Sequence, residues 1–527
     1  MYFVPSWYHG NEYKENEQYF YVRRAVTEFD DSVKQIQMFN RNDIMDYKIL
    51  NLSYSPNFRH FLHRQSVFHA PYWSCFDAIQ EIRRTKVDIL SYHDLMWPDH
   101  TEFVYTPFCI VAYVNNMKYA EVHFGEDGNM IEVFLFQSEV MVRKNIYDDR
   151  GFLSTTIVYQ NNQPIYEQYL DGKGNWKLCH FFEDGHVEVN PENPFYLINN
   201  KRYDFNCLNY DSMEPLIEEV FSTYLDEMTN SSDIFCLAMH TLHHDLLESL
   251  FTQRKTILSF YQNRLELFED AELKSLIRNT NYCIVDSKHK IRPLEKYAGK
   301  TLPIVDITPF DTRADFGISQ QLTVQNILVP IDTIEQSKFE ALIVLFAKYF
   351  ETNETARVHF FTRVANWDRV DSVLNFIREV LKVNGLDERL ARKETNDKAE
   401  FDLDEEKKVP IKFFVDQCVD ELSISKCMRE QRIMVDVTSR PDLYLQISCI
   451  SSAIPQIVSH ITQYVHNGKN GFVVKDISEV SRCLTYYLDN ITNWNKCVIY
   501  SYELGKEYNT ASLIRKWKGV MKQVEQD

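Results

Sequence analysis

The sequence predicts an α/β protein in which two parallel-sheet domains face each other across a cleft and an antiparallel β-domain interrupts the first of them. Short apolar segments alternate with helical patterns in the first hundred residues and again from about Met213, as in parallel sheets covered by helices. Between Thr101 and Pro194 the apolar period is instead close to two. The 527 residues are enough for two or three such domains.

The first hundred residues begin the first parallel sheet. Tyr2–Val4 and Tyr47–Leu52 are predicted strands because they are short, apolar and bounded by polar or loop-forming residues. A helix is expected to run toward Ile36, and a second helix is expected over Tyr72–Arg84. This order of strand and helix is typical of the start of a doubly wound domain.

Turn-forming residues divide the period-two segment into hairpins. Asp-Gly and Asn-rich dipeptides tolerate the positive φ that tight turns between antiparallel strands need. The turns are expected at 126–128, 148–151, 161–162, 171–172 and 184–185. We therefore predict an antiparallel β-meander inserted into the first α/β domain.

Strands and helices alternate again in the remainder of the chain. The predicted strands are Asp233–Met239, Thr256–Tyr261, Tyr282–Asp286, Pro303–Ile307, Val324–Ile331, Val358–Arg363, Ile411–Val415 and Ile433–Val437. A helix is expected over Gln336–Phe350, and the densely charged segment Asp387–Lys408 is expected to be a solvated loop or the end of a helix. The predicted domains are a first Rossmann-like domain (1–100 and 201–318), the inserted β-domain (101–200), a second Rossmann-like domain (319–510) and a C-terminal helix (511–527).

Composition limits the possible partners. A net charge of -19 disfavours nucleic acid and broad adsorption to anionic lipid, so we expect no nucleic-acid partner and at most peripheral membrane contact. No signal-peptide pattern and no apolar run of membrane-spanning length is evident, which predicts a cytoplasmic protein. None of the 11 cysteines forms a Cys-x-x-Cys pair, so no structural metal is expected.

Glycine-rich phosphate-binding motifs are missing. The chain has 14 glycines and neither Gly-x-Gly-x-x-Gly nor Gly-x-x-x-x-Gly-Lys-Ser, although a nucleotide site on an α/β sheet usually needs glycine for close backbone approach. The loop after the first strand, from Pro5 to Gly10, carries Trp7 and Tyr8. Such a loop fills a cleft more readily than it wraps a diphosphate, and we expect no cofactor.

A histidine cluster follows the strand predicted at 233–239. On a helix, His240 and His244 would share one face at metal-ligand spacing, with His243 and Asp245 beside them. The interpretation as polar residues at a strand-to-helix turn is the simpler one. A remnant of a sugar-binding site is the alternative, and a metal site is the weakest of the three.

The segment Ile454–Asp476, IPQIVSHITQYVHNGKNGFVVKD, is predicted to form strand, loop, Asn-Gly turn and strand, followed by an amphipathic helix. It resembles the end of the nucleotide-sugar-binding domain of GT-B glycosyltransferases. Retaining enzymes of that class place two glutamates eight positions apart before it, and here those positions hold Arg440 and Ser448. The resemblance also implies a donor-diphosphate contact near Lys338, which is equally consistent with a surface position on a helix.

Basic residues gather in PNFRHFLHRQ, where Arg59, His60, His63 and Arg64 form the best candidate for a local basic patch in this acidic chain. Such clusters are usually solvated or paired with carboxylates. A contact surface for a partner is the functional alternative.

The stretches FVPSWYHGNEYKENEQYFYVRR, SPNFRHFLHRQ and PYWSCFDAIQ resemble the first of the accessory secretory proteins of the accessory Sec system of Gram-positive cocci. The resemblance implies a GT-B-like fold with an extra β-domain and no transferase activity. It also implies partners: the second and third accessory secretory proteins, the accessory Sec motor ATPase and a glycosylated serine-rich-repeat adhesin. Recruitment to the inner face of the membrane at the translocase would follow.

Two functions therefore stand at this point. The first is a non-catalytic component of an export complex that assists cytosolic handling and translocation of the adhesin. The second is an active nucleotide-sugar-dependent glycosyltransferase that modifies the adhesin, with Lys338 and Arg440 neutralising the diphosphate and His240 or His244 near the reacting sugar. Such chemistry depends on electrostatic stabilisation of the departing diphosphate.

Overall fold

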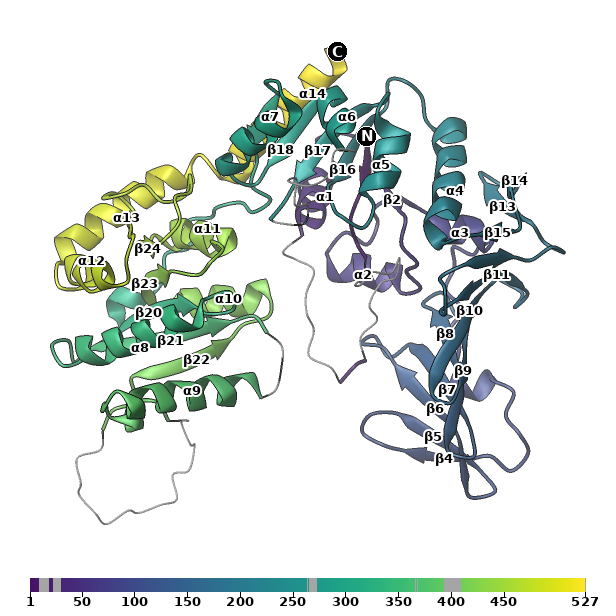
Figure 1. The fold of residues 1–527 in the computed structure, drawn as a ribbon, viewed down its shortest axis with the longest axis horizontal. Coiled ribbons are helices and arrows are strands. Elements are labelled where there is room, and N and C mark those ends of the chain that lie inside the picture. The colour runs from purple at the N-terminus through teal and green to yellow at the C-terminus, as the bar shows by residue number, and fades with distance from the viewer. Residues whose placement is uncertain are drawn as a thin grey trace.

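The structure is a computed structural model that describes residues 1–8, 19–21, 30–262, 264, 273–364, 366, 368–392 and 409–526. It contains two parallel sheets and one long antiparallel sheet (Figure 1). The fold is α/β, with two Rossmann-like units in a GT-B arrangement and the antiparallel sheet inserted into the first, as the sequence predicts.

The first parallel sheet has seven strands in the order β19-β18-β17-β16-β1-β2-β3. The central strand β16 is buried at every position, because helices cover both faces of the sheet. The strands are β1 (Tyr2–Val4), β2 (Lys48–Asn51), β3 (Tyr72–Ser74), β16 (Ile234–Ala238), β17 (Lys255–Phe260), β18 (Tyr282–Val285) and β19 (Ile304–Asp306). The helices are α1 (Asp31–Asn42), α2 (Phe58–Arg64), α3 (Cys75–Ile79), α4 (Met213–Met228), α5 (His244–Phe251), α6 (Leu273–Asn279) and α7 (Ile291–Ala298).

The helix predicted over Tyr72–Arg84 is wrong at both ends. Its first three residues form β3, which pairs in parallel with β2, and the helix α3 is only Cys75–Ile79. The Ser74 side chain accepts a hydrogen bond from the Asp77 amide and caps the helix, so the chain cannot be helical before it. The helix ends where the Gln80 side chain turns to bond the Leu170 carbonyl of the inserted sheet.

The inserted sheet has ten strands in the order β15-β12-β11-β10-β9-β8-β7-β6-β5-β4, and a separate hairpin joins β13 to β14. The strands are β4 (Glu102–Tyr105), β5 (Ile110–Val114), β6 (Met117–Phe124), β7 (Met130–Gln137), β8 (Val140–Asp148), β9 (Phe152–Gln160), β10 (Gln163–Leu170), β11 (Trp176–Phe181), β12 (Val187–Val189), β13 (Phe195–Ile198), β14 (Lys201–Asp204) and β15 (Asn209–Tyr210). Positive φ occurs at the expected turn residues Gly128, Gly151, Asn161, Asn162 and Gly185.

One predicted turn is shifted, and three were missed. In the turn expected at 171–172 the positive φ belongs to Gly174, and the Asp171 carboxylate accepts from the amides of Lys173 and Asn175. Further tight turns with positive φ lie at 115–116, 138–139 and 199–200. Two of them are Asn-Asn pairs like the predicted turn at 161–162 and were overlooked, whereas the turn at 138–139 contains neither glycine nor asparagine.

The second parallel sheet has six strands in the order β22-β21-β20-β23-β24-β25. The strands are β20 (Gln325–Pro330), β21 (Ala356–Thr362), β22 (Phe413–Gln417), β23 (Gln431–Asp436), β24 (Gln456–Val458) and β25 (Gly471–Val473). The helices are α8 (Gln336–Tyr349), α9 (Arg369–Val383), α10 (Glu421–Met428), α11 (Leu443–Ser452), α12 (Ser478–Leu488), α13 (Ile491–Gly505) and α14 (Thr510–Gln526). The predicted strand, turn, strand and helix over 454–488 is confirmed by β24, β25 and α12.

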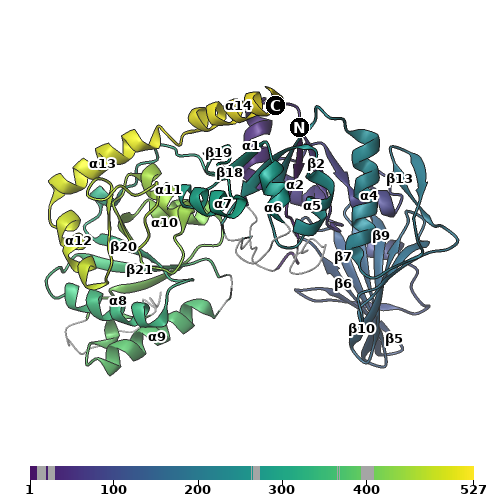
Figure 2. The ribbon, with the colours of Figure 1, turned by 45° about the horizontal axis from the view of Figure 1, so that its top comes forward.

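The C-terminal helix α14 returns to the first sheet, while α12 and α13 lie beside the second (Figure 2). Its fully buried Trp517 contacts the Phe39 ring of α1 edge-on, with ring centroids 5.1 Å apart. The last helix therefore ties the two halves of the chain together. Of the segment Asp387–Lys408, residues 393–408 lie outside the described residues.

Candidate functional site

A cavity of about 1020 Å³ lies between the two parallel sheets, where the loops after their strands meet. Tyr261, Arg264 and Lys290 line it from the first sheet, and Arg363 and Arg440 line it from the second. Ligands of open α/β sheets bind in the crevice outside the carboxyl ends of the strands. This interdomain cleft is therefore the candidate functional site.

The first wall of the cleft is built around Arg264. Its Nη2 lies 2.8 Å from Asp31 Oδ1, and its Nη1 lies 3.2 Å from Asp30 Oδ2 and donates to Ser6 Oγ at 2.8 Å. Asp30 is the N-cap of α1 and accepts from the Val33 amide. Burial and the neighbouring Asp31 carboxylate raise the pKa of Asp30 to about 6, and the Arg264 charge only partly offsets them. Asp30 and Asp31 thus both pair with Arg264, the cation of this wall that faces the cleft.

A second pair on the same wall joins the end of β18 to the turn that follows it. Lys290 Nζ lies 2.6 Å from the buried Asp286 carboxylate, which also accepts from the Gln262 amide at 2.6 Å. Burial lowers the pKa of Lys290 and raises the pKa of Asp286. This lysine is therefore also committed to a carboxylate of its own wall.

The second wall carries a comparable but more exposed pair. Arg363, just after β21, lies 2.7 Å from Asp442, which caps α11 by accepting from the Leu445 amide. The buried Asp436 accepts from the Thr438 hydroxyl and amide and so shapes the loop between β23 and α11. Each of the three cations Arg264, Lys290 and Arg363 thus has a carboxylate partner.

The aromatic side chains of the loop after β1 pack against neighbouring helices and turns. Trp7 is buried, packs its ring 4.8 Å from that of Phe61, and donates from Nε1 to Asp30. The Tyr8 hydroxyl lies 2.8 Å from Nδ1 of the fully buried His243. Gly10 lies outside the described residues.

The histidine cluster forms a strand-to-helix turn. The helix α5 begins at His244, so His240 precedes it and the two do not share a helical face. Nε2 of His243 lies 2.6 Å from the Ala238 carbonyl, and burial lowers the pKa of His243 to about 3. His244 lies 2.6 Å from Asp245. The simpler interpretation, polar residues at a strand-to-helix turn, is confirmed because α5 begins only at His244.

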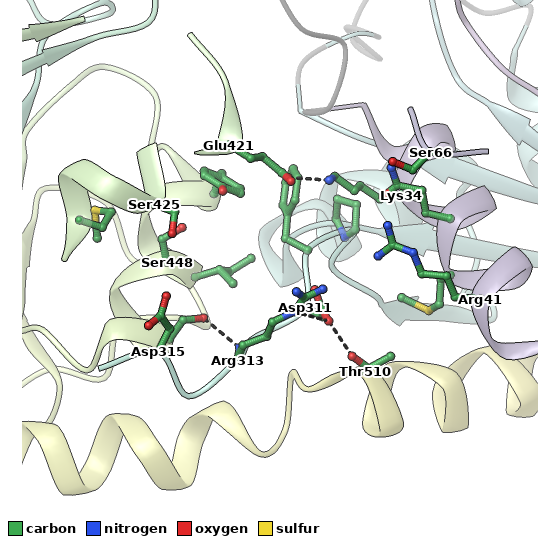
Figure 3. A pocket seen from close by; sticks show the side chains of 18 of the residues that line it. Lys34, Arg41, Ser66, Asp311, Arg313, Asp315, Glu421, Ser425, Ser448 and Thr510 are labelled. Carbon is green, nitrogen blue, oxygen red and sulfur yellow. Dashed lines mark hydrogen bonds and ion pairs between the residues drawn. The ribbon is translucent and has the colours of Figure 1, made fainter. Parts of the chain in front are cut away.

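Arg440 and Ser448, which the sequence analysis aligns with the glutamates of retaining enzymes, line different cavities. Arg440 lines the cleft, whereas Ser448, on α11, lines a neighbouring cavity of about 550 Å³. Figure 3 shows that cavity, with Ser448 near Ser425 and with the Lys34–Glu421 ion pair, 2.6 Å long, across it. Tyr444 lines both cavities.

Lys338 lies in the first turn of α8, with its Nζ 2.9 Å from Glu335. Lys338 is not one of the described residues that line the cleft cavity. The structure therefore brings Arg440, and not Lys338, to the cleft. The sequence analysis missed Arg264 and Arg363, although each follows a buried strand.

The basic cluster on α2 faces the inserted sheet. Arg64 lies 3.5 Å from Glu126, and His60 Nε2 lies 3.4 Å from Asp127. Arg59 lies 3.9 Å from the buried Asp149, and the His63 ring contacts the exposed ring of Phe68. Three of the four basic side chains thus join α2 to turns of the inserted sheet, which leaves His63 as the most outward member.

In the described part of the chain, no three His, Cys, Asp or Glu side chains are grouped so that they could hold a metal ion. Nor does any helix there combine the length and the apolar character needed to cross a membrane.

Comparison with solved structures defines the class. The pneumococcal O-GlcNAc transferase GtfA in complex with UDP and GlcNAc has a TM-score of 0.67 at 11% identity, with coverage of 100% of this chain and 99% of that one. TarM has a TM-score of 0.62 at 14% identity, with coverage of 99% and 98%. At these identities the likeness establishes the fold alone: the protein has the GT-B fold of glycosyltransferases.

Sequence comparison gives the family. The family model for accessory secretory protein 1 of the accessory Sec system matches residues 1–524 of this chain. Relatives from Streptococcus gordonii and Staphylococcus aureus are each 30% identical, over 99% and 97% of both chains respectively. The chain belongs to this family of accessory Sec system proteins. A crystal structure of accessory secretory protein 1, 2 and 3 in Streptococcus pneumoniae contains a chain with a TM-score of 0.76 at 28% identity, with coverage of 100% and 99%.

Proposed function

We propose that the protein is a non-catalytic, glycosyltransferase-like component of the accessory Sec export complex. It assists the cytosolic handling and translocation of glycosylated serine-rich-repeat adhesins. Its partners are the second and third accessory secretory proteins, the accessory Sec motor ATPase and the adhesin. It acts in the cytoplasm and is recruited to the inner face of the membrane at the translocase.

The pairing of cations in the cleft is the observation that carries the proposal. A transferase must stabilise the charge of a departing nucleoside diphosphate with preorganised donors. Here Arg264, Lys290 and Arg363 each lie within 2.8 Å of a carboxylate. A diphosphate would have to displace those carboxylates, and the repulsion between like charges would oppose its binding.

The two former glutamate positions support the same proposal. Arg440 reverses the charge at one position, and Ser448 lies on the neighbouring cavity at the other. Lys338, the expected diphosphate contact, forms its ion pair with Glu335 on the outside of α8. The GT-B architecture thus remains while the charges that the chemistry requires are rearranged.

Co-expression with the second and third accessory secretory proteins of the same organism tests the complex. We expect a tagged chain to retain both proteins through affinity and size-exclusion steps. A matched chain carrying Trp517→Ala, which weakens the tie between α14 and the first sheet, should retain less. Failure of the unmodified chain to retain either protein would overturn the proposal.

An active transferase is the alternative that the shared GT-B fold and the cleft cavity favour. Arg440 is then the cation nearest to a donor diphosphate. If Arg440→Ala abolished a measurable sugar transfer to the adhesin, the alternative would replace the proposal.

A further inference from the structure

One edge of the inserted sheet is open in the described part of the chain. The strand β4 pairs with β5 along one side, and none of the described strands pairs with its other side. Figure 1 shows β4 at the end of the inserted sheet that is remote from the first parallel sheet. At the opposite end, β15 contacts α4, and the Tyr210 hydroxyl donates to Glu219 of that helix. The two ends of the sheet are thus protected differently.

The hydrogen-bond pattern of β4 identifies the outward groups. The Thr106 amide donates to the Cys109 carbonyl at 3.0 Å, which makes these two residues a hydrogen-bonded pair. Bonded and non-bonded pairs alternate along an antiparallel ladder. In the register of β4 with β5, the backbone groups of Val104 therefore point to β5, and those of Phe103 and Tyr105 point away from it. The open edge offers these two residues as donors and acceptors.

Apolar side chains flank this edge on both faces of the sheet. Val104 is 48% exposed, Tyr105 67% and Phe108 56%. The Tyr105 hydroxyl lies 2.8 Å from that of Tyr92, and the Phe108 ring contacts Tyr21 edge-on at 5.1 Å. Proteins usually protect an open edge with lysine, proline or a covering element, so an edge with exposed apolar groups marks a place of contact.

The charge around the edge is of one sign. Residues 87–117 contain four carboxylates and neither lysine nor arginine. Asp94, Asp99 and Glu102 are exposed on or just before β4. A second copy of this chain would bring the same carboxylates to the same edge, and its net charge of -19 would add to the repulsion. A segment that carries positive charge fits better.

We propose that the outer edge of β4 takes an extended segment of a partner protein as an additional strand, with basic residues near Asp99 and Glu102 and apolar residues against Val104 and Tyr105. The main-chain groups of Phe103 and Tyr105 supply the hydrogen bonds, and the apolar side chains select the segment. This inference rests on the proposed function for its partner: the segment belongs to the second or the third accessory secretory protein.

The test measures the affinity of the purified full chain for the co-purified second and third accessory secretory proteins. Tyr105→Ala removes only the ring. Tyr105→Pro also removes the backbone N–H of Tyr105, which points away from β5 toward the proposed partner strand. Edge strands tolerate proline at such a position. We expect Tyr105→Pro to weaken the affinity by at least about tenfold and by more than Tyr105→Ala does. Equal affinity of Tyr105→Pro and the unmodified chain would overturn the inference and leave the proposed function standing.

Two further measurements separate the possible outcomes. Hydrogen exchange at the amides of Phe103 and Tyr105 should slow in the complex, and unchanged exchange there would contradict strand addition even if Tyr105→Pro failed to fold. The double variant Asp99→Asn/Glu102→Gln should weaken binding and its salt dependence, whereas Glu183→Gln, an exposed carboxylate elsewhere on the inserted domain, should not. If the unmodified chain binds neither protein, the proposed function fails and this inference fails with it.

Discussion

The two walls of the interdomain cleft both hold their charges in pairs, but they bury those pairs to different depths. On the first wall the Arg264 side chain is 13% exposed and its partner Asp31 is 2% exposed. On the second wall Arg363 and Asp442 are each 23% exposed. Because buried charges depend on their partners far more than exposed ones do, the first wall is part of the framework and the second wall can change at little cost.

This difference bears on which positions of the cleft can vary. The deep pair on the first wall joins the loop after β17 to the start of α1, and it would resist replacement. Arg440 and Ser448, which the sequence analysis aligns with the glutamates of retaining enzymes, both lie on the second half. The comparison therefore predicts that variants of the first wall lower stability, whereas variants of the second wall leave it nearly unchanged.

Arg264→Met should have the largest effect. It leaves the buried Asp31 carboxylate and its neighbour Asp30 without their cation, so the free energy of unfolding should fall by about 3–5 kcal/mol. Denaturant unfolding at neutral pH measures this change. A loss below about 1 kcal/mol would contradict the structural role of the first wall.

His243→Gln should remove a pH dependence behind the same wall. The pKa of His243 is about 3 in the folded protein and near 6.5 in an unfolded chain. As pH falls below 6.5 the unfolded state binds the proton first, so the free energy of unfolding of the native sequence falls. The stability advantage of His243 over the Gln variant should shrink by about 1–2 kcal/mol between pH 6.5 and pH 5. A difference that stays constant with pH would refute the burial of a neutral imidazole.

Arg363→Met, the counterpart of Arg264→Met on the second wall, should cost about 0–1 kcal/mol because solvent screens its pair with Asp442. The same unfolding experiment makes the two variants directly comparable. If Arg363→Met proved as destabilising as Arg264→Met, the distinction between the walls would disappear.

Lys338→Ala should have the smallest effect. Lys338 and Glu335 form an exposed pair on the first turn of α8, so the change in stability should stay within about 0.5 kcal/mol. Retention of the second and third accessory secretory proteins should also be unchanged. Weakened binding of UDP by this variant would show instead that Lys338 contacts a nucleotide.

Local pattern predicted most of the fold. Strands such as β16 and β20 are short, apolar and bounded by polar residues, so they could be predicted. Turn-forming residues such as Gly128 and Asn161 indicated the hairpins of the inserted sheet. The strand β3 was not predicted, because Tyr72–Ser74 is too short to show a hydrophobic period. Its pairing with β2 is a long-range contact that the local sequence does not show.

The candidate site was less accessible to sequence reasoning. Arg440 could be placed at the cleft from its spacing to a recognisable segment, but the pairs Arg264–Asp31 and Arg363–Asp442 join residues 233 and 79 positions apart. Nothing local in the chain relates such partners, because the loops that carry them meet only when the sheets form. The same holds for α2, whose Arg64 pairs with Glu126 in the turn between β6 and β7.

Calorimetric titration of the purified chain with UDP and UDP-N-acetylglucosamine, with released product followed in the same sample, tests the central claim most directly. If the paired cations leave no site for a diphosphate, neither ligand should bind and no sugar should be released. Binding accompanied by turnover would contradict the account and make the cleft an enzyme site despite Arg440 and Ser448.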